Sequence, residues 1–253
     1  MAKIVPKLSR KMKSAQGEIA INTFSKYIKF IEKNCKKDKI IFRGQRQDKP
    51  LLPKISRINL IKSILISEKI MISDFKRESF PHLSFKPTND WDWLALMQHH
   101  GLATRLLDWT QNPLAALWFA VNKPAKVNSH GVVWIFSPSG KDYAHIEKDN
   151  ALKPGHTKIF RPHHITNRIV SQSGWFTVHS YQRKMKRGFI PLEKISRYKN
   201  QLIKLTIPGN SFADMRYQLD RFNVNQKTLF PDLDGLCQNI EWVNIFLDDE
   251  KGT

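Results

Sequence analysis

The sequence has few cysteines and no long apolar run, and each shortage excludes a class of protein. Its 253 residues include two cysteines, which are too few for a disulfide framework or a four-cysteine zinc site. The longest unbroken apolar stretch, residues 114–121, is far shorter than the roughly 20 residues that cross a membrane. The basic first residues, 1–16, lack the apolar core of a secretion signal. We therefore expect a reduced, cytoplasmic protein with no membrane partner.

Several familiar ligand-binding and catalytic motifs are also missing. The chain has neither the GxxxxGK[ST] loop nor the GxGxxG loop of the common nucleotide-binding folds. The histidine pair His99-His100 has no cysteine or acid at a familiar zinc spacing. A second pair, His163-His164, lies in a basic segment and could either contact phosphate or face solvent. The acids are not paired around a lysine in the way that a metal-dependent nuclease requires. The sequence therefore favours neither a metal site nor a nuclease.

Acids are scarce compared with bases. The chain has 22 Asp and Glu against 42 Lys and Arg, so its formal net charge is +20. Such a surplus attracts anionic partners, above all DNA or RNA. A lysine-rich surface that is merely solvated accounts for the surplus equally well, because net charge governs association and not a specific site. The residues predicted to contact nucleic acid form two basic clusters and are Lys33, Lys36, Lys37, Arg183, Lys184, Lys186 and Arg187.

Apolar periodicity predicts a protein in which helices and strands alternate. Helices are expected at residues 18–37, 60–79, 90–99, 113–121, 211–222 and 232–243, and strands at 40–42, 104–109, 131–136, 175–179 and 202–207. Glu68 interrupts the apolar stripe of the second predicted helix. Gly101 should end the third helix, and Ser211 with Asp214 has the spacing of a capping box at the start of the fifth. We predict a single α+β domain over residues 17–247 that begins with a basic helical cap. A basic N-terminus, 1–16, precedes it, and a tail, 248–253, follows it.

Three segments carry the motifs of a known family. The first contains Phe42, Arg43, Gly44 and Gln45 and continues as LPKISR over residues 52–57, the second reads QHHGLATRLLDWT over 98–110, and the third reads RIVSQSGWFT over 168–177. Together they resemble the FRG domain, a bacterial and phage-borne family named after its Phe-Arg-Gly motif. The resemblance extends over about residues 20–180. It implies a toxin or an antiphage effector, whose protein partner would be an antitoxin or another member of a defence system.

The first two motifs suit an anionic ligand. Arg43 at a strand end could bind phosphate oxygens in a bidentate way, and Gly44 would let the ligand approach the backbone. Alternatively, Arg43 pairs with a carboxylate such as Asp108 and only supports the fold. In the second motif, the structural alternatives are a buried pair of Arg105 with Asp108 and an Asn112 cap on the next helix.

The order of the elements is similar to that of the mono-ADP-ribosyltransferases. This similarity implies a mixed β core and NAD as the cofactor. Arg43 would hold the NAD phosphates or ribose, Thr110 would occupy the second-strand position, and Gln172 would replace the catalytic glutamate. One of the paired histidines, His100 in this prediction, would act as an acid–base residue. The predicted catalytic residues are Arg43, Thr110, Gln172 and His100, and the predicted cofactor-binding residues are Arg43, Gly44, Gln45, Gln98, His99, Asp108 and Trp109.

Gln172 is the main departure from the transferase pattern. A neutral amide can form the hydrogen bond of the missing glutamate, but it cannot supply negative charge to an oxocarbenium-like centre. Asp108, Glu147 or Asp220 would have to supply that charge. Two functions therefore stay open: transfer of ADP-ribose to a nucleic acid or a nucleic-acid-associated protein, and non-catalytic binding of nucleic acid or a nucleotide.

Overall fold

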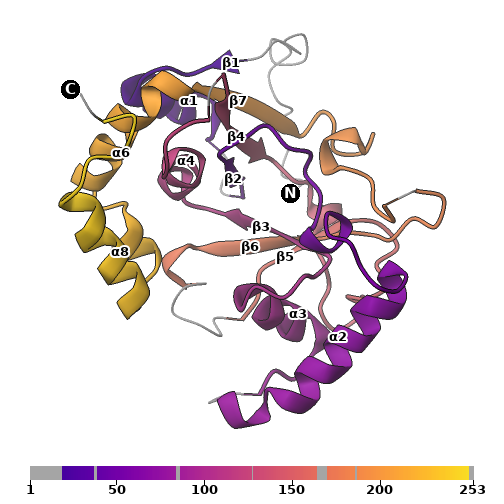
Figure 1. The fold of residues 1–253 in the computed structure, drawn as a ribbon. Coiled ribbons are helices and arrows are strands. Elements are labelled where there is room, and N and C mark those ends of the chain that lie inside the picture. Colours follow the sequence, from indigo (N-terminus) through magenta and orange to yellow (C-terminus); the bar gives the residue numbers. More distant parts are fainter. Residues whose placement is uncertain are drawn as a thin grey trace, which may run out of the picture.

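The computed structural model of the protein describes residues 19–36, 39–83, 86–126, 128–163, 170–185 and 187–250, and Figure 1 shows its fold. Lys37 and Lys186 of the predicted nucleic-acid surface lie outside the described residues, as do Arg168 of the third motif and the predicted N-terminal segment 1–16. Among the described residues, no helix has both the length and the apolar composition that a membrane crossing requires. The part of the chain that the structure describes also contains no cluster of three or more His, Cys, Asp or Glu side chains that could hold a metal ion.

The described residues form one seven-stranded mixed sheet at the centre of the molecule (Figure 1). In spatial order its strands are β1 (Ile19–Ala20), β7 (Leu202–Pro208), β4 (His130–Phe136), β2 (Ile41–Gln45), β3 (Leu106–Thr110), β6 (Gly174–Val178) and β5 (Lys158–Phe160). β1 and β7 are parallel, and the other neighbouring strands of this sheet are antiparallel. The sheet and its surrounding helices confirm the predicted α+β class.

The sheet is weakly joined at its middle, between β2 and β3. β2 pairs with β4 through all five of its residues, and β3 pairs with β6 in the same way. Between β2 and β3, by contrast, the register consists of a single pair, Phe42 with Thr110. The two halves of the sheet therefore meet at one point, and side chains of both strands line the space where the strands part.

The helices pack against the two halves of the sheet in separate clusters. α1 (Phe24–Asn34), α4 (Pro113–Val121) and α6 (Phe212–Arg221) share a core with apolar side chains of β2, β4 and β7. α2 (Ile64–Glu78) and α3 (Asp90–His99) share another with β3, β5 and β6. α7 (Gln226–Leu229) and α8 (Leu233–Val243) contact each other after α6. In Figure 1, α6 and α8 lie on one side of the molecule and α2 and α3 on the opposite side.

Local signals predicted two helix boundaries correctly. α3 has the predicted bounds, and Gly101 after it has a φ of +82°, which glycine adopts at little cost. α4 begins at Pro113, and the side chain of Asn112 accepts hydrogen bonds from two backbone N–H groups of the first turn. The predicted asparagine cap and first-turn proline therefore define the start of this helix.

The prediction that a strand ends at Phe42 was wrong. β2 continues to Gln45, because its last residues keep their register with β4, where Gly44 faces Val133 and Gln45 faces Val132. β2 is a central strand, and its pairing with β4 extends it beyond its short apolar run. Arg43 is therefore a strand residue and not the first residue of a loop.

One prediction about a helix start also needs correction. The capping box of Ser211 with Asp214 does not form, because Ser211 has helical backbone angles and its Oγ donates to the carbonyl oxygen of Asn22 at 2.9 Å. The predicted basic cap helix, α1, also contributes one buried side chain to the core. Its Tyr27 is fully buried, and the hydroxyl donates to the carbonyl oxygen of Pro113 at 2.8 Å.

Candidate ligand-binding groove

Residues of all three motifs line one groove, which lies where β2 and β3 part. Its volume is about 290 Å³. The lining residues come from β2, α3, β3, α4 and the turn before β6, and they are Phe42, Arg43, Gly44, Gln98, Asp108, Trp109, Thr110, Phe119 and Gln172. A smaller hollow of about 70 Å³ shares four of these residues and adds His99, Gly174, Trp175 and Phe176. The fold thus brings most of the predicted site residues together.

Arg43 presents a buried and incompletely bonded guanidinium to this groove. Its side chain is 17 % exposed, and Nη1 donates to the carbonyl oxygen of Asp108 at 2.8 Å and lies 3.5 Å from Asp108 Oδ2. Its Nε is buried and has no hydrogen-bond partner among the described residues. Burial lowers the pKa of Arg43, the charge of Asp108 raises it, and the charge of Arg57 lowers it again. An arginine stays protonated despite such shifts, so this group can still accept an anion.

Gly44 lines the groove and also allows the close packing of α4. A Cβ atom at this position would overlap the carbonyl oxygen of Ala116 and would lie 2.8 Å from the backbone nitrogen of Ala120. α4 therefore rests on β2 at a distance that only glycine allows. The sequence analysis assigned this glycine to ligand access, and the packing of α4 is a second reason why this position requires glycine.

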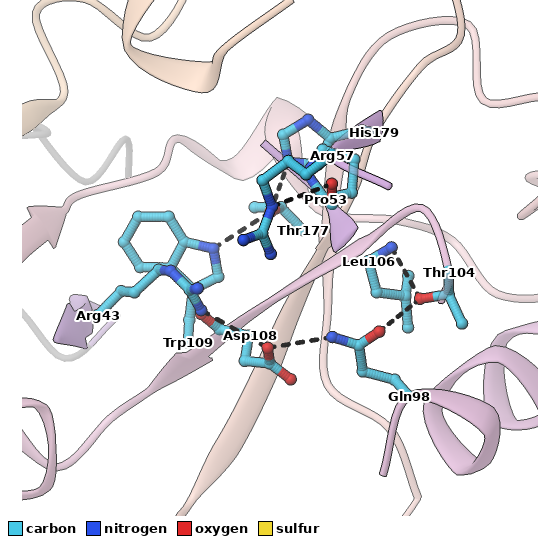
Figure 2. Close-up of polar contacts among 10 residues, drawn as sticks. All are labelled: Arg43, Pro53, Arg57, Gln98, Thr104, Leu106, Asp108, Trp109, Thr177 and His179. Atoms are coloured by element: carbon cyan, nitrogen blue, oxygen red, sulfur yellow. Dashed lines mark hydrogen bonds and ion pairs between the residues drawn. The ribbon is translucent and has the colours of Figure 1, made fainter. Parts of the chain in front are cut away.

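A directed chain of hydrogen bonds orients the acid of the groove. Figure 2 shows Asp108 beside Arg43 at one end of this chain and Thr104 at the other. The backbone N–H of Leu106 donates to Thr104 Oγ1 at 3.1 Å, and Thr104 Oγ1 donates to Gln98 Oε1 at 2.7 Å. The oxygen of the Gln98 amide is thus fixed toward Thr104, so its Nε2 donates to Asp108 Oδ2 at 3.1 Å. One backbone N–H therefore sets the direction of the whole chain.

The sequence analysis considered a pair of Arg105 with Asp108, but the structure does not contain this pair. Arg105 Nε donates to Glu68 Oε1 at 2.8 Å, its Nη2 pairs with Glu68 Oε2, and its Nη1 donates to the carbonyl oxygen of Leu152 at 2.7 Å. Asp108 points instead to Arg43. Side chains alternate along an extended segment, so positions 105 and 108, which are three residues apart, face opposite sides of the sheet. Glu68, the acid that interrupts the stripe of α2, is the residue that sequence reasoning missed.

Thr110 and Gln172 hold the groove wall together. Thr110 Oγ1 donates to the carbonyl oxygen of Gln172 at 2.5 Å and accepts a hydrogen bond from the N–H of Asn112 at 2.9 Å. The side-chain amide of Gln172 donates to the carbonyl oxygen of Leu229 at 3.0 Å. Both side chains line the groove, and these bonds connect β3, the turn before β6 and α7.

Two predicted site residues do not line the groove or its smaller neighbour. His100 is exposed at the end of α3, where its ring stands at 87° to that of His99. The side-chain oxygen of Gln45 accepts a hydrogen bond from the indole nitrogen of Trp134 at 3.1 Å. His99 itself lines only the smaller hollow.

A buried histidine that the sequence analysis did not single out, His179, is connected through Thr177 to Trp109, which lines the groove. His179 Nε2 lies 3.2 Å from Thr177 Oγ1, and the indole N–H of Trp109 donates to the same hydroxyl at 3.1 Å (Figure 2). Burial, and then the charges of Arg43 and Arg105, lower the pKa of His179 to about 3. His179 is therefore neutral near pH 7. Its only signal in the sequence was its position two residues after Thr177 on a predicted strand, which places both on one face.

The predicted nucleic-acid residues that the structure describes lie on the surface. Lys33 is in the last turn of α1 and Lys36 follows that helix, and both are exposed. Arg183, Lys184 and Arg187 are exposed in the connection between β6 and β7. Their exposure leaves them accessible to a polyanion.

Residues 38–129 of the chain match the family model of the FRG domain. The chain therefore contains an FRG domain, as its motifs predicted. The matched segment includes β2, α3, β3 and α4, and it supplies every residue that lines the larger groove except Gln172. No curated protein and no solved structure matches the chain.

Proposed function

We propose that the groove binds the phosphate-bearing part of a nucleotide, with NAD as the ligand, and that the protein is an FRG-domain effector that transfers ADP-ribose. The observation that carries this proposal is the guanidinium of Arg43, which is buried in the groove with its Nε unpaired among the described residues. A buried donor without a partner costs roughly 1–3 kcal/mol. A phosphate oxygen at this place would recover that free energy and form a charge-assisted bond.

The charges around Arg43 support an anionic ligand. Asp108 is the acid that lines the groove beside it, while Arg57 is near enough to lower the pKa of Arg43 by repulsion (Figure 2). A ligand with negative charge would relieve this repulsion between two guanidinium groups. The groove of about 290 Å³ is at the lower limit of small-molecule sites, so it would enclose only part of a dinucleotide. The faces of Trp109 and Phe119 supply its apolar wall.

Asp108 is the best candidate for the negative charge that Gln172 cannot supply. Among the three acids considered, it lines the groove, whereas Glu147 is exposed between β4 and β5 and Asp220 accepts a hydrogen bond from the side chain of Asn225. When bound, NAD would supply an ADP-ribosyl group and release nicotinamide. Asp108 would stabilise positive charge that develops on the ribose, and Gln98 would hold the carboxylate in place.

One observation favours a non-catalytic binding module as the second candidate. One N–H of the Gln172 side-chain amide is engaged with the carbonyl oxygen of Leu229, so this amide supports the groove wall, and it carries no negative charge to stabilise an oxocarbenium-like centre. In this alternative the groove binds a nucleotide or a nucleic-acid end without cleaving it. In both candidates the exposed bases of α1 and of the β6–β7 connection would attract a nucleic-acid target, and the effector would be paired with an antitoxin or another defence protein.

Melting curves with NAD and with ADP-ribose test the proposal. A ligand that binds only the folded state at 100 times its Kd stabilises it by about 2.7 kcal/mol. We expect both ligands to raise the melting temperature of the protein and Arg43→Ala to abolish the increase. Arg46→Ala is the matched control, because Arg46 is an exposed arginine just after β2 that does not line the groove.

Release of nicotinamide from NAD separates the two candidates. Stabilisation with release supports the transferase, and stabilisation without release supports the binding module. If neither ligand changes the melting temperature at millimolar concentration, the groove is not a site for NAD. If Arg46→Ala reduces the effect as much as Arg43→Ala does, the bound anion lies outside the groove.

A further inference from the structure

A second cavity, of about 430 Å³, lies at the C-terminal end of α4. It is formed by the end of α4, by α6, and by the segment from α7 to the residues after α8. Trp118 of α4 lines this cavity, whereas its neighbour Phe119 lines the groove. The two sites are therefore separate and lie on different sides of one helix.

Two tryptophans give this cavity aromatic walls. Trp118 packs against Phe230 with ring centroids 5.9 Å apart, and Trp242 packs against Tyr217 at the same separation. These contacts hold the indole rings in place before any ligand binds. Apolar side chains that include Ile245 complete the wall. A planar ring would gain stacking and apolar burial here with little loss of side-chain entropy.

An unpaired acceptor lies in the same lining. The side-chain oxygen of Asn122, at the C-terminus of α4, is buried and has no hydrogen-bond partner among the described residues. A carbonyl oxygen can only accept, so the group that satisfies it must carry an N–H or O–H donor. A heteroaromatic ring with an N–H at its edge would donate to this oxygen, and its plane would stack on the tryptophans.

The charges of the cavity favour a neutral ligand. Arg216 is 3 % exposed, but its guanidinium is already neutralised by Asp249 and Glu250. Lys123 and Glu241 also line the cavity and carry opposite charges. Counted together with Asp249 and Glu250, the acids at the cavity outnumber its two cations. The groove, by contrast, is lined by one arginine and one acid. An anionic nucleotide would therefore find no net positive charge here.

We propose that this cavity binds an uncharged heteroaromatic molecule of the nucleobase or nucleoside class. The ring contacts Trp118 and Trp242, and an N–H of the ring edge donates to Asn122 Oδ1. This site is independent of the groove and does not require that NAD bind there.

Titration of the full chain with adenosine, guanosine, cytidine and uridine tests the proposal. We expect one or more of these nucleosides to bind with a stoichiometry of one and to quench tryptophan fluorescence. Asn122→Leu, which keeps the size of the side chain but removes the acceptor, should weaken the binding at least tenfold. Trp242→Leu should weaken it by a similar factor, and each variant is first shown to be folded by its melting curve.

Arg43→Ala is the matched control, because it changes the groove and leaves the cavity intact. It should bind the nucleoside as the unmodified protein does, and Asn122→Leu should retain the response to ADP-ribose if the groove binds that ligand. The proposal is overturned if none of the four nucleosides binds at millimolar concentration. It is also overturned if a nucleoside binds and Asn122→Leu has the same affinity as the unmodified protein, or if Arg43→Ala is the variant that loses the binding.

Discussion

Arg105 and Glu68 form a buried ion pair that connects α2 with the turn before β3. Both side chains are at most 5 % exposed, and Nε of the arginine donates to Oε1 of the glutamate at 2.8 Å. Their positions lie 37 residues apart in the sequence. Since the carbonyl oxygen of Leu152 accepts from the same guanidinium, this one side chain joins three segments beneath the groove.

The ion pair predicts an asymmetric response to mutation. Arg105→Ala leaves a buried carboxylate without its partner, so it should lower the free energy of unfolding by roughly 3–5 kcal/mol. Replacing both partners, with Arg105→Met and Glu68→Leu, should cost far less, because no charge is left unpaired. Urea unfolding followed by circular dichroism measures both. Equal losses in the single and double variants would contradict this role for the pair.

Gly44→Ala should destabilise the protein through the α4 backbone. The added methyl group would overlap the carbonyl oxygen of Ala116, and such overpacking typically costs about 1–3 kcal/mol. Gly155→Ala is the matched control, because a Cβ at Gly155 would meet no atom within 4 Å. The two melting temperatures provide the test. If the two variants have the same melting temperature, α4 does not pack on β2 as closely as the structure has it.

Thr104→Val should impair the groove more than the fold. Valine has the same shape, but it cannot donate to Gln98, so the amide that holds Asp108 loses its fixed direction. The unpaired N–H of Leu106 should cost about 1–3 kcal/mol of stability. We expect about a tenfold loss in nicotinamide release or, in a binding module, in affinity for ADP-ribose.

Thr104→Ser is the control for this prediction, because serine restores the hydroxyl and should restore function. A Thr104→Val protein with unchanged function would show that the hydrogen-bond chain does not position Asp108. Loss of function in Thr104→Ser as well would indicate that the methyl group, and hence packing, is what matters at this position.

His179 should make the fold sensitive to acid. Its pKa of about 3 in the folded protein is well below the value of about 6.5 in an unfolded chain. Below about pH 6.5 the unfolded state therefore binds more protons, and stability falls by up to about 1.4 kcal/mol per pH unit as the pH approaches 3. Above about pH 6.5 the full contribution is present.

The comparison of His179→Gln with the unmodified protein isolates this contribution. Unfolding free energies of both proteins between pH 7 and pH 4 should fall less steeply for the variant, since glutamine does not titrate. His145→Gln is the control, because His145 is exposed and should change the slope little. Parallel curves for His179→Gln and the unmodified protein would assign the acid sensitivity to other groups.

Nucleic-acid binding, if the basic clusters provide it, should depend steeply on salt. Each phosphate contact that is removed lowers the slope of log K against log salt concentration by about 1. Lys33→Glu with Lys36→Glu should therefore flatten the dependence for unspecific DNA. Lys153→Glu with Lys227→Glu makes the same charge change at exposed lysines of other surfaces. Equal effects of both double variants would mean that net charge, and not a defined surface, attracts the DNA.

The helices next to the groove could be predicted because their signals are local. Asn112 and Pro113 mark the start of α4 within two residues, and Gly101 marks the end of α3 within two. Caps, a first-turn proline and a left-handed glycine act through bonds to the nearest backbone groups. The motifs were sufficient in the same way to identify the FRG domain, since its residues are contiguous in the sequence.

The short strands β1 and β5 and the end of β2 could not be predicted in this way. β1 and β5 have two and three residues, which is too few for a periodic pattern. Each exists because a partner strand satisfies its backbone: β1 pairs with β7, which is far away in the sequence, and β5 pairs with β6. The extent of such a strand depends on its neighbour and not on its own residues.

The sequence by itself determined the α+β class, the main helices and the set of polar residues from which the groove is built. Only the tertiary structure decided how these residues pair. Glu68, and not Asp108, is the partner of Arg105, and Asp108 is the partner of Arg43. Gly44 lies under α4, and His179 lies behind Trp109. The physical reason is that ion pairs and close packing depend on which surfaces meet after the chain has folded, and a linear pattern does not contain that information.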